Sequence, residues 1–180
     1  MAYSTATKAL MASALKELVS KEGFEKVSVG EIAELCQMNR KSFYYHFHDK
    51  YELVIWIFEN EFLQQAKNED EDLWCSVSAL CEYFYKNRAF YKNIITVEGQ
   101  NSFAEYFRDL CTRTLVNKLK DELEDITITD NNVNMYAGFF VYNIYLWLTG
   151  SDKRCAKEFV KDLRNSVIFG AELAKIFQKQ

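Results

Sequence analysis

The sequence contains no proline and only six glycines among its 180 residues. These two residue types are the usual breakers of helices and the usual formers of tight turns. Their scarcity favours long helices connected by short polar turns, and it argues against a fold built from many short strands. The sequence therefore predicts an all-α protein.

Motifs of common enzymes are also missing. The sequence has no G-x-S-x-G, no H-E-x-x-H and no glycine-rich phosphate loop. Its two histidines, His46 and His48, lie two positions apart, so on a helix they do not face each other, and no third metal ligand lies nearby. We therefore expect no enzymatic activity, no cofactor and no metal site.

Cysteine occurs in an odd number and forms no C-x-x-C pair, which is untypical of a disulfide framework or a zinc ribbon. We interpret the thiols as buried, with redox sensing as the alternative. The first 18 residues alternate as an amphipathic helix and contain no long apolar run, so they do not read as a secretory signal. These features predict a cytoplasmic protein. The cysteines are Cys36, Cys75, Cys81, Cys111 and Cys155.

Basic residues do not dominate the chain, whose net charge is −4 and whose hydrophobic content is 49%. The hydrophobic content is too high for a mostly disordered protein. The net charge argues against a chain coated in basic residues, so any affinity for nucleic acid must come from a local patch. Residues 39–50 form such a patch, because they hold Arg40, Lys41 and Lys50 against the single acid Asp49.

Two short helices with well-marked starts are predicted around that patch. Ser28 and Glu31 form an S-x-x-E capping box ahead of a helix, and Asn39 is a suitable N-cap for the next one. In the second helix Phe43 and Phe47 share one face, while the basic and tyrosine side chains point elsewhere. In the first helix the predicted apolar face consists of Val29, Ile32, Ala33 and Leu35.

Only residues 36–38 separate the two helices, which is the spacing of a helix-turn-helix. In that motif the second helix enters the major groove of DNA. Two short capped helices joined by a turn also occur in ordinary helical proteins, so the pattern alone leaves both interpretations open.

Residues 7–62 resemble the N-terminal domain of the TetR family of transcriptional regulators. The segments ALKELVSKEGFEKVSVGEIAELC and RKSFYYHFHDKYEL carry the resemblance, above all S-F-Y-Y-H-F followed by D-K. Two positions depart from the family pattern: Gln37 replaces a turn glycine, and Lys41 replaces a small residue. A left-handed Gln37 would cost about 1–2 kcal/mol. A closer resemblance is to the branch that contains the activator of dihydroxyacetone kinase operons.

The resemblance implies a homodimer that binds double-stranded DNA at a palindromic operator. Arg40 and Lys41 are then candidates for base edges, and Tyr45 for a thymine methyl group. Ser28 and Gly30 could approach the DNA backbone or a base. The candidates for phosphates are Ser42, Tyr44, His46 and Lys50.

Apolar periodicity predicts further helices with the approximate bounds 5–21, 50–67, 73–86, 90–95, 102–123, 135–148 and 156–177. We expect the helix of residues 5–21 to end at Gly23. Its predicted buried face consists of Leu10, Ala14, Leu15, Leu18 and Val19. We expect a three-helix DNA-binding domain in residues 1–49 and a helical regulatory and dimerisation domain in residues 50–180. The acidic run 68–74 reads as a solvated turn.

Residues 135–148 are apolar almost all round, with Asn143 as the one strongly polar side chain. Fourteen residues are too few for a membrane span, which needs about 20. A helix that is apolar on every side must be buried on every side. We therefore expect residues of about 130–177 to pair with their copies in a homodimer, and we expect no contact with a membrane.

The family resemblance also implies an effector pocket in the helical body. Its candidate lining residues share only an aromatic or polar character, and each would serve equally well as core: Tyr83, Tyr106, Phe107, Cys111, Tyr136, Phe140 and Asn143. In the branch named above, sensing can be delegated to a coregulator protein, so the effector is either a small molecule or a protein. The competing interpretation of the whole chain is a helical ligand-binding or adaptor protein that does not bind DNA.

Overall fold

The computed structural model describes residues 2–64, 72–97, 99, 101–119, 130–151 and 153–178. The regular secondary structure of this part is entirely helical, which confirms the predicted fold class. In chain order the helices are α1 (Ala2–Glu22), α2 (Val29–Leu35), α3 (Arg40–His46), α4 (Lys50–Phe58), the π-helix η1 (Glu59–Leu63), α5 (Leu73–Lys86), α6 (Arg88–Ile94), α7 (Phe103–Leu119), α8 (Asp130–Thr149) and α9 (Ala156–Phe177).

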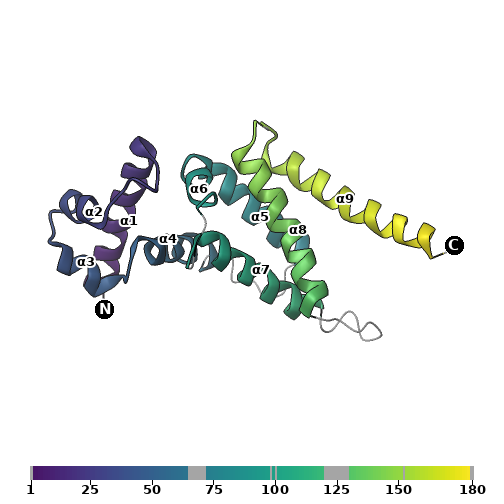
Figure 1. Cartoon of the computed structure of the whole chain (residues 1–180), viewed down its shortest axis with the longest axis horizontal. Coiled ribbons are helices and arrows are strands. Elements are labelled where there is room, and N and C mark those ends of the chain that lie inside the picture. The colour runs from purple at the N-terminus through teal and green to yellow at the C-terminus, as the bar shows by residue number, and fades with distance from the viewer. Residues whose placement is uncertain are drawn as a thin grey trace.

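Figure 1 shows a head at the N-terminal end, made of α1, α2 and α3, and a body of α5 to α8. α4 runs between the two and packs against both α1 and α7. α9 contacts α5 near its start and then extends away from the body toward the C-terminus. The head and the body share one continuous hydrophobic core, which runs from Met11 in α1 to Leu163 in α9.

The predicted helix starts in the head are confirmed. The Ser28 hydroxyl accepts a hydrogen bond from the Glu31 amide at 3.3 Å, and the Glu31 carboxylate accepts one from the Ser28 amide at 2.7 Å. The same bonds hold the pKa of Glu31 below its usual value. Asn39 caps α3 by accepting a bond from the Ser42 amide at 2.9 Å. These caps satisfy backbone donors that a helix leaves free at its start.

The backbone of the turn between α2 and α3 is strained at Gln37, the position where the family pattern has glycine. Gln37 has a φ of 55°, in the left-handed region that favours glycine. Its amide donates to the Glu34 carbonyl at 2.9 Å, and the Met38 amide donates to the Ala33 carbonyl at 2.8 Å. The turn therefore forms with a non-glycine residue, and hydrogen bonds on either side of Gln37 hold it in place.

Two apolar side chains assigned to the core lie outside it. Leu10 is 47% exposed and Leu35 is 44% exposed, so these assignments were wrong. The predicted Ala14, Leu15 and Val19 are buried, and Met11, which was not predicted, is buried with them. A helix as short as α2 buries only its central residues against its neighbours, which leaves Leu35 at its end in solvent.

The helix predicted for residues 50–67 is interrupted. It is α-helical only as far as Phe58 and continues as the π-helix η1, while residues 65–67 lie outside the described part. The Phe58 ring lies within 6.4 Å, centroid to centroid, of seven other rings. An extra residue in a helical turn re-aims the side chains after it, and such turns are frequent at functional sites.

The body helices agree with the predicted ones to different degrees. α5 and α9 have the predicted bounds, whereas α8 starts at Asp130, five residues before the predicted start. The predicted end of the 102–123 helix and most of the acidic run 68–74 lie outside the described residues. Within the described part, no helix is both long and apolar enough to cross a membrane.

The Lys50 side chain points into the head. The sequence had predicted that it contacts a DNA phosphate. Its Nζ donates to the carbonyl oxygens of Phe24, Glu25 and Val27 at 2.8, 3.1 and 2.7 Å, and it lies 4.5 Å from the centre of the Phe24 ring. Burial lowers the pKa of this amine. An ammonium has three protons to donate, so a phosphate contact would require breaking one of these bonds. Lys50 acts as a structural cation that ties the start of α4 to the 24–27 loop.

The strained turn leads to a first prediction. Gln37→Gly should stabilise the protein by about 0.5–1 kcal/mol, because the relief of about 1–2 kcal/mol of strain exceeds the extra chain entropy of glycine. Urea unfolding followed by circular dichroism measures the difference. Gln37→Ala is the matched control, since it keeps the Cβ and should gain nothing. Equal stabilisation by both variants would show that the left-handed backbone is not the cause.

A second prediction separates structural from surface lysines. Lys50→Met should destabilise the protein by about 2 kcal/mol, because it leaves three carbonyls without their charged donor. For a chain of this size that loss lowers the melting temperature by about 4–8 °C. Lys41→Met, at an exposed position nearby, should change stability by less than about 0.5 kcal/mol. Similar melting temperatures for Lys50→Met and the wild type would refute the structural role.

Candidate nucleic-acid interface and body pocket

α3 presents a basic and aromatic face to solvent. Phe43 and Phe47 are buried and hold the helix against the head. On the other side Tyr44 and Tyr45 are 55% and 84% exposed, and the Arg40 and Lys41 side chains are exposed as well. Large exposed rings that lie side by side among polar residues are typical of an interaction surface. Cations beside them favour a polyanion as the partner. The α3 face therefore has the chemistry of a surface that binds nucleic acid.

Three of the predicted residues meet where α2 begins beside α3. A Cβ added to Gly30 would lie 3.5 Å from Nε of Arg40 and 3.5 Å from Oγ of Ser28. The Arg40 side chain thus passes directly over the start of α2. Arg40, Ser28 and Gly30 form one local surface, although ten or more residues of sequence separate the arginine from the other two.

The other predicted residues of α3 occupy different environments. The Ser42 hydroxyl donates to Oδ1 of Asn39 at 3.1 Å, so it takes part in the N-cap. The His46 ring is half-buried and meets the Tyr45 ring edge-on, with 5.0 Å between centroids. Lys50 alone is directed away from this face, as described above.

A polar joint connects the head to the body at η1. The Lys16 ammonium of α1 lies 2.6 Å from each carboxylate oxygen of Glu61. The Tyr83 hydroxyl of α5 donates to the same carboxylate at 3.0 Å, and it therefore accepts from the Tyr91 hydroxyl 2.8 Å away. Burial raises the pKa of both phenols, so they stay protonated and keep donating. The ion pair is half-buried and is screened less than a surface pair.

A second acid of the same turn reaches another helix. The Tyr106 hydroxyl of α7 donates to the Glu59 carboxylate at 2.9 Å. Through Glu59 and Glu61 the five residues of η1 thus contact α1, α5 and α7. These bonds join the head to the body, together with the packing of α1 against α4 and α6.

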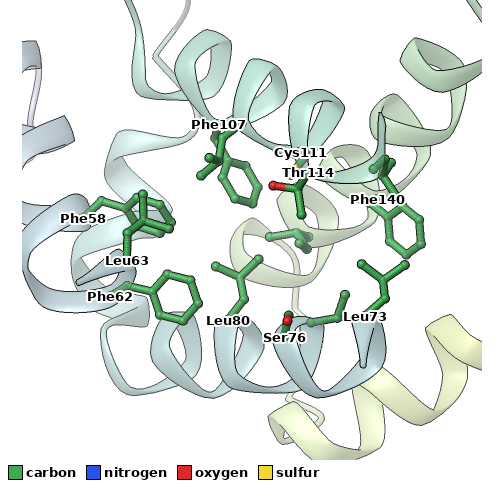
Figure 2. Close-up of a pocket in the computed structure, with 14 residues that line it drawn as sticks. Phe58, Phe62, Leu63, Leu73, Ser76, Leu80, Phe107, Cys111, Thr114 and Phe140 are labelled. Carbon is green, nitrogen blue, oxygen red and sulfur yellow. The ribbon is translucent and has the colours of Figure 1, made fainter. Parts of the chain in front are cut away.

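A cavity of about 210 Å³ lies on the other side of η1, between this turn and α5, α7 and α8. Figure 2 shows side chains from all four elements pointing into it. The described side chains that line it are apolar except for two hydroxyls and one thiol. The lining residues are Phe58, Phe62, Leu63, Leu73, Ser76, Val77, Leu80, Phe107, Leu110, Cys111, Thr114, Leu115, Phe140 and Ile144.

The sequence found only part of this pocket. Phe107, Cys111 and Phe140 line it, whereas Tyr83 and Tyr106 are bound to the η1 acids outside it. Tyr136 is 61% exposed on α8, and the Asn143 amide donates to its own helix at the Phe139 carbonyl. Aromatic residues occur all along these helices, and no periodicity separates a lining residue from a core one.

α8 exposes an apolar stripe. Met135, Phe139, Tyr142 and Leu146 are between 36% and 69% exposed and follow one another at spacings of four, three and four residues. This spacing is typical of the face that one helix packs against another. In α9, moreover, no described residue after Leu163 is buried, although Ile168, Phe169, Ile176 and Phe177 are large and apolar. One chain therefore leaves α8 and α9 incompletely covered.

Comparison with known proteins identifies both parts of the chain. Residues 12–56 match the family described as bacterial regulatory proteins of the tetR family, and residues 71–168 match a transcriptional regulator C-terminal region of the TetR type. The first match contains the whole of α2 and α3, and the second spans α5 to α8 and half of α9.

Individual relatives are transcriptional regulators. The chain is 30% identical over 109 residues to the HTH-type dhaKLM operon transcriptional activator DhaS of Lactococcus lactis, and the match covers 59% of this chain and 57% of that protein. This similarity agrees with the branch resemblance drawn from the sequence.

Solved structures share the fold over most of the chain. A dihydroxyacetone kinase operon activator, DhaS, superposes with a TM-score of 0.64 at 20% identity, covering 93% of this chain and 97% of that one. NalD, a secondary repressor of the MexAB-OprM efflux pump in Pseudomonas aeruginosa, superposes with a TM-score of 0.59 at 16% identity, covering 93% and 96%. With its helix-turn-helix head and its matched C-terminal region, this chain belongs to the TetR family of transcriptional regulators.

Proposed function

We propose that the protein is a sequence-specific, DNA-binding transcriptional regulator that works as a homodimer under the control of an effector. The observation that carries this proposal is the α3 face, where Phe43 and Phe47 anchor the helix and the cations and tyrosines stay exposed. Family membership supports it. A regulator of this kind acts in the cytoplasm, where bacterial DNA is found. We divide the chain accordingly into a DNA-binding domain, 1–49, and a regulatory and dimerisation domain, 50–180.

The exposed residues of α3 have distinct proposed roles. Arg40 and Lys41 stand at the start of the helix and reach for base edges, where the forked guanidinium matches guanine. Tyr45, the most exposed of the α3 rings, contacts a thymine methyl group. Phosphates are contacted by Tyr44 and His46, with Ser28 and Gly30 approaching the backbone or a base from α2. Ser42 is omitted because it donates its one hydroxyl proton to Asn39. Lys50 is omitted from this set because its ammonium already donates three hydrogen bonds to backbone carbonyls.

Dimerisation is proposed to occur through α8 and α9, within residues 130–177. The exposed stripe on α8 and the uncovered half of α9 are both apolar, and pairing with a second copy would bury them together. A two-fold dimer presents two α3 helices to two half-sites of a palindromic operator. The adaptor alternative, without DNA binding, gives no reason for the exposed cations and tyrosines of α3.

A direct test of the function is DNA binding measured by fluorescence anisotropy, with the intergenic DNA beside the protein's own gene. We expect site-preferring binding that weakens by about 1000-fold or more between low and moderate salt if six or more phosphates are contacted. The Arg40→Ala, Tyr44→Phe double variant should lose at least about 2 kcal/mol of binding free energy, because it removes a base contact and a phosphate contact.

The matched control for this test is the double variant Arg108→Ala, Tyr85→Phe, at exposed positions of α7 and α5. It removes the same chemical groups from the body and should bind DNA like the wild type. Equal, weak and salt-insensitive binding by all three proteins would overturn the regulator and favour the adaptor alternative.

The proposed dimer leads to its own prediction. The double variant Met135→Glu, Tyr142→Glu places carboxylates at two positions of the α8 stripe and should convert the dimer to a folded monomer, because charges are not buried without partners. Light scattering coupled to size-exclusion chromatography measures the mass. Lys157→Glu, at an exposed position in the first turn of α9, should remain dimeric. A dimeric double variant would place the interface elsewhere.

A further inference from the structure

We propose that the side-chain amide of Gln37, in the turn between α2 and α3, donates a hydrogen bond to a phosphate of the bound DNA and so helps to fix the position of α3 in the groove. This inference rests on the proposed function, because it adds one contact to the same DNA-binding surface. It concerns a position at which glycine, the residue that the backbone favours, has no side chain to offer.

The Gln37 side chain costs the fold strain and adds no bond to it. Its backbone has a φ of 55°, a conformation that glycine adopts without penalty and a side chain makes unfavourable. The backbone amide donates to the Glu34 carbonyl, which any residue except proline could do. Within the part of the chain that the structure describes, the side-chain amide makes no hydrogen bond. Strain of this kind collects at functional sites, so the amide is a candidate for a contact outside the folded chain.

The turn presents this one side chain outward from a fixed backbone. Cys36 is buried and Met38 packs against the core, whereas Gln37 between them is exposed. The Cys36 amide donates to the Ile32 carbonyl at 3.1 Å, and the Met38 amide donates to the Ala33 carbonyl at 2.8 Å. Both neighbours of Gln37 are therefore held in place. Only the glutamine side chain itself has to be ordered on binding, which keeps the entropic cost of a contact low.

The place of the turn indicates a phosphate as the partner. Figure 1 shows α2 and α3 on the side of the head that faces away from the body. Arg40 and Lys41, the proposed base contacts, follow Gln37 by three and four positions. A helix with its side chains is about 10–12 Å across, close to the width of about 12 Å of the major groove. The segment that leads into α3 therefore crosses the edge of the groove, where the phosphates lie. A glutamine amide carries two N–H donors, and glutamine is among the uncharged residues that contact phosphates.

The test uses the charge of the side chain at this one position. Fluorescence anisotropy with the intergenic DNA beside the protein's own gene measures operator affinity at several salt concentrations. Gln37→Ala and Gln37→Gly should each bind at least about tenfold more weakly than the wild type, because each subunit loses a hydrogen bond to a charged group. The amide is neutral, so both variants should keep the salt dependence of the wild type. Gln37→Lys should steepen the slope of log affinity against log salt by about 0.9 for each subunit.

Melting temperatures separate this contact from a structural role. Gln37→Gly relieves the backbone strain, so it should melt at a higher temperature than the wild type and yet bind DNA more weakly. Gln37→Ala keeps the strain and should melt like the wild type. A residue with a purely structural role would not make the more stable variant the weaker binder. If glycine restores the affinity that alanine loses, the backbone and not the amide is responsible, and the proposal is overturned.

The matched control is Gln64, which is exposed at the end of η1 in the body. Gln64→Ala and Gln64→Lys make the same chemical changes there and should bind with the affinity and the salt slope of the wild type. Steepening of the slope by Gln64→Lys equal to that by Gln37→Lys would show that the added charge acts from anywhere on the protein, and would overturn the contact at Gln37.

A second duplex of unrelated sequence separates a phosphate from a base. Phosphate contacts carry no sequence information, so Gln37→Ala should leave the ratio of operator to unrelated affinity within about threefold of its wild-type value. A collapse of that ratio would assign the amide to a base and overturn the phosphate contact. Binding of the operator by Gln37→Ala with full affinity would refute the contact and leave the proposed function intact. Absence of DNA binding by the wild type would refute the proposed function itself, so the two failures are distinguishable.

Discussion

The packing of the Phe58 ring holds the body of this protein together. Phe58 is the last residue of α4, and rings from η1, α5, α6 and α7 surround it at centroid distances of 5.3 to 6.4 Å. Since α4 also packs on α1, contacts with both the head and the body hold the helix in place. The η1 turn that follows Phe58 therefore joins three environments: the hydrocarbon core, the cavity and the polar joint with Lys16.

The head divides its cations between two tasks. Arg40 and Lys41 are directed outward on α3, while Lys50 is directed inward and donates to three backbone carbonyls. All three residues lie in one basic segment of the sequence. Their different roles depend on where α3 ends and α4 begins, because Asp49 caps α4 and places Lys50 at its first position, beside the 24–27 loop.

Apolar side chains in the body serve three purposes that look alike in the sequence. Phe107 lines the cavity, Trp147 is buried in the core, and Tyr142 belongs to the exposed stripe of α8. The all-round apolar character of residues 135–148 predicted a helix in need of covering, and the structure shows which face one chain leaves uncovered. Only three of the predicted pocket residues, Phe107, Cys111 and Phe140, line the cavity, since the helix spacing does not distinguish these surroundings.

The sequence by itself determined the fold class, the starts of α2 and α3, the bounds of α5 and α9, and the basic face of α3. Helix caps, helix breakers and apolar periodicity are local signals, because each depends only on residues a few positions apart in the chain. Only the tertiary structure decided the inward turn of Lys50, the π-turn after Phe58, the Lys16–Glu61 joint and the cavity. Each of these depends on residues far apart in the chain, whose contacts are fixed by how whole helices pack and not by any local pattern.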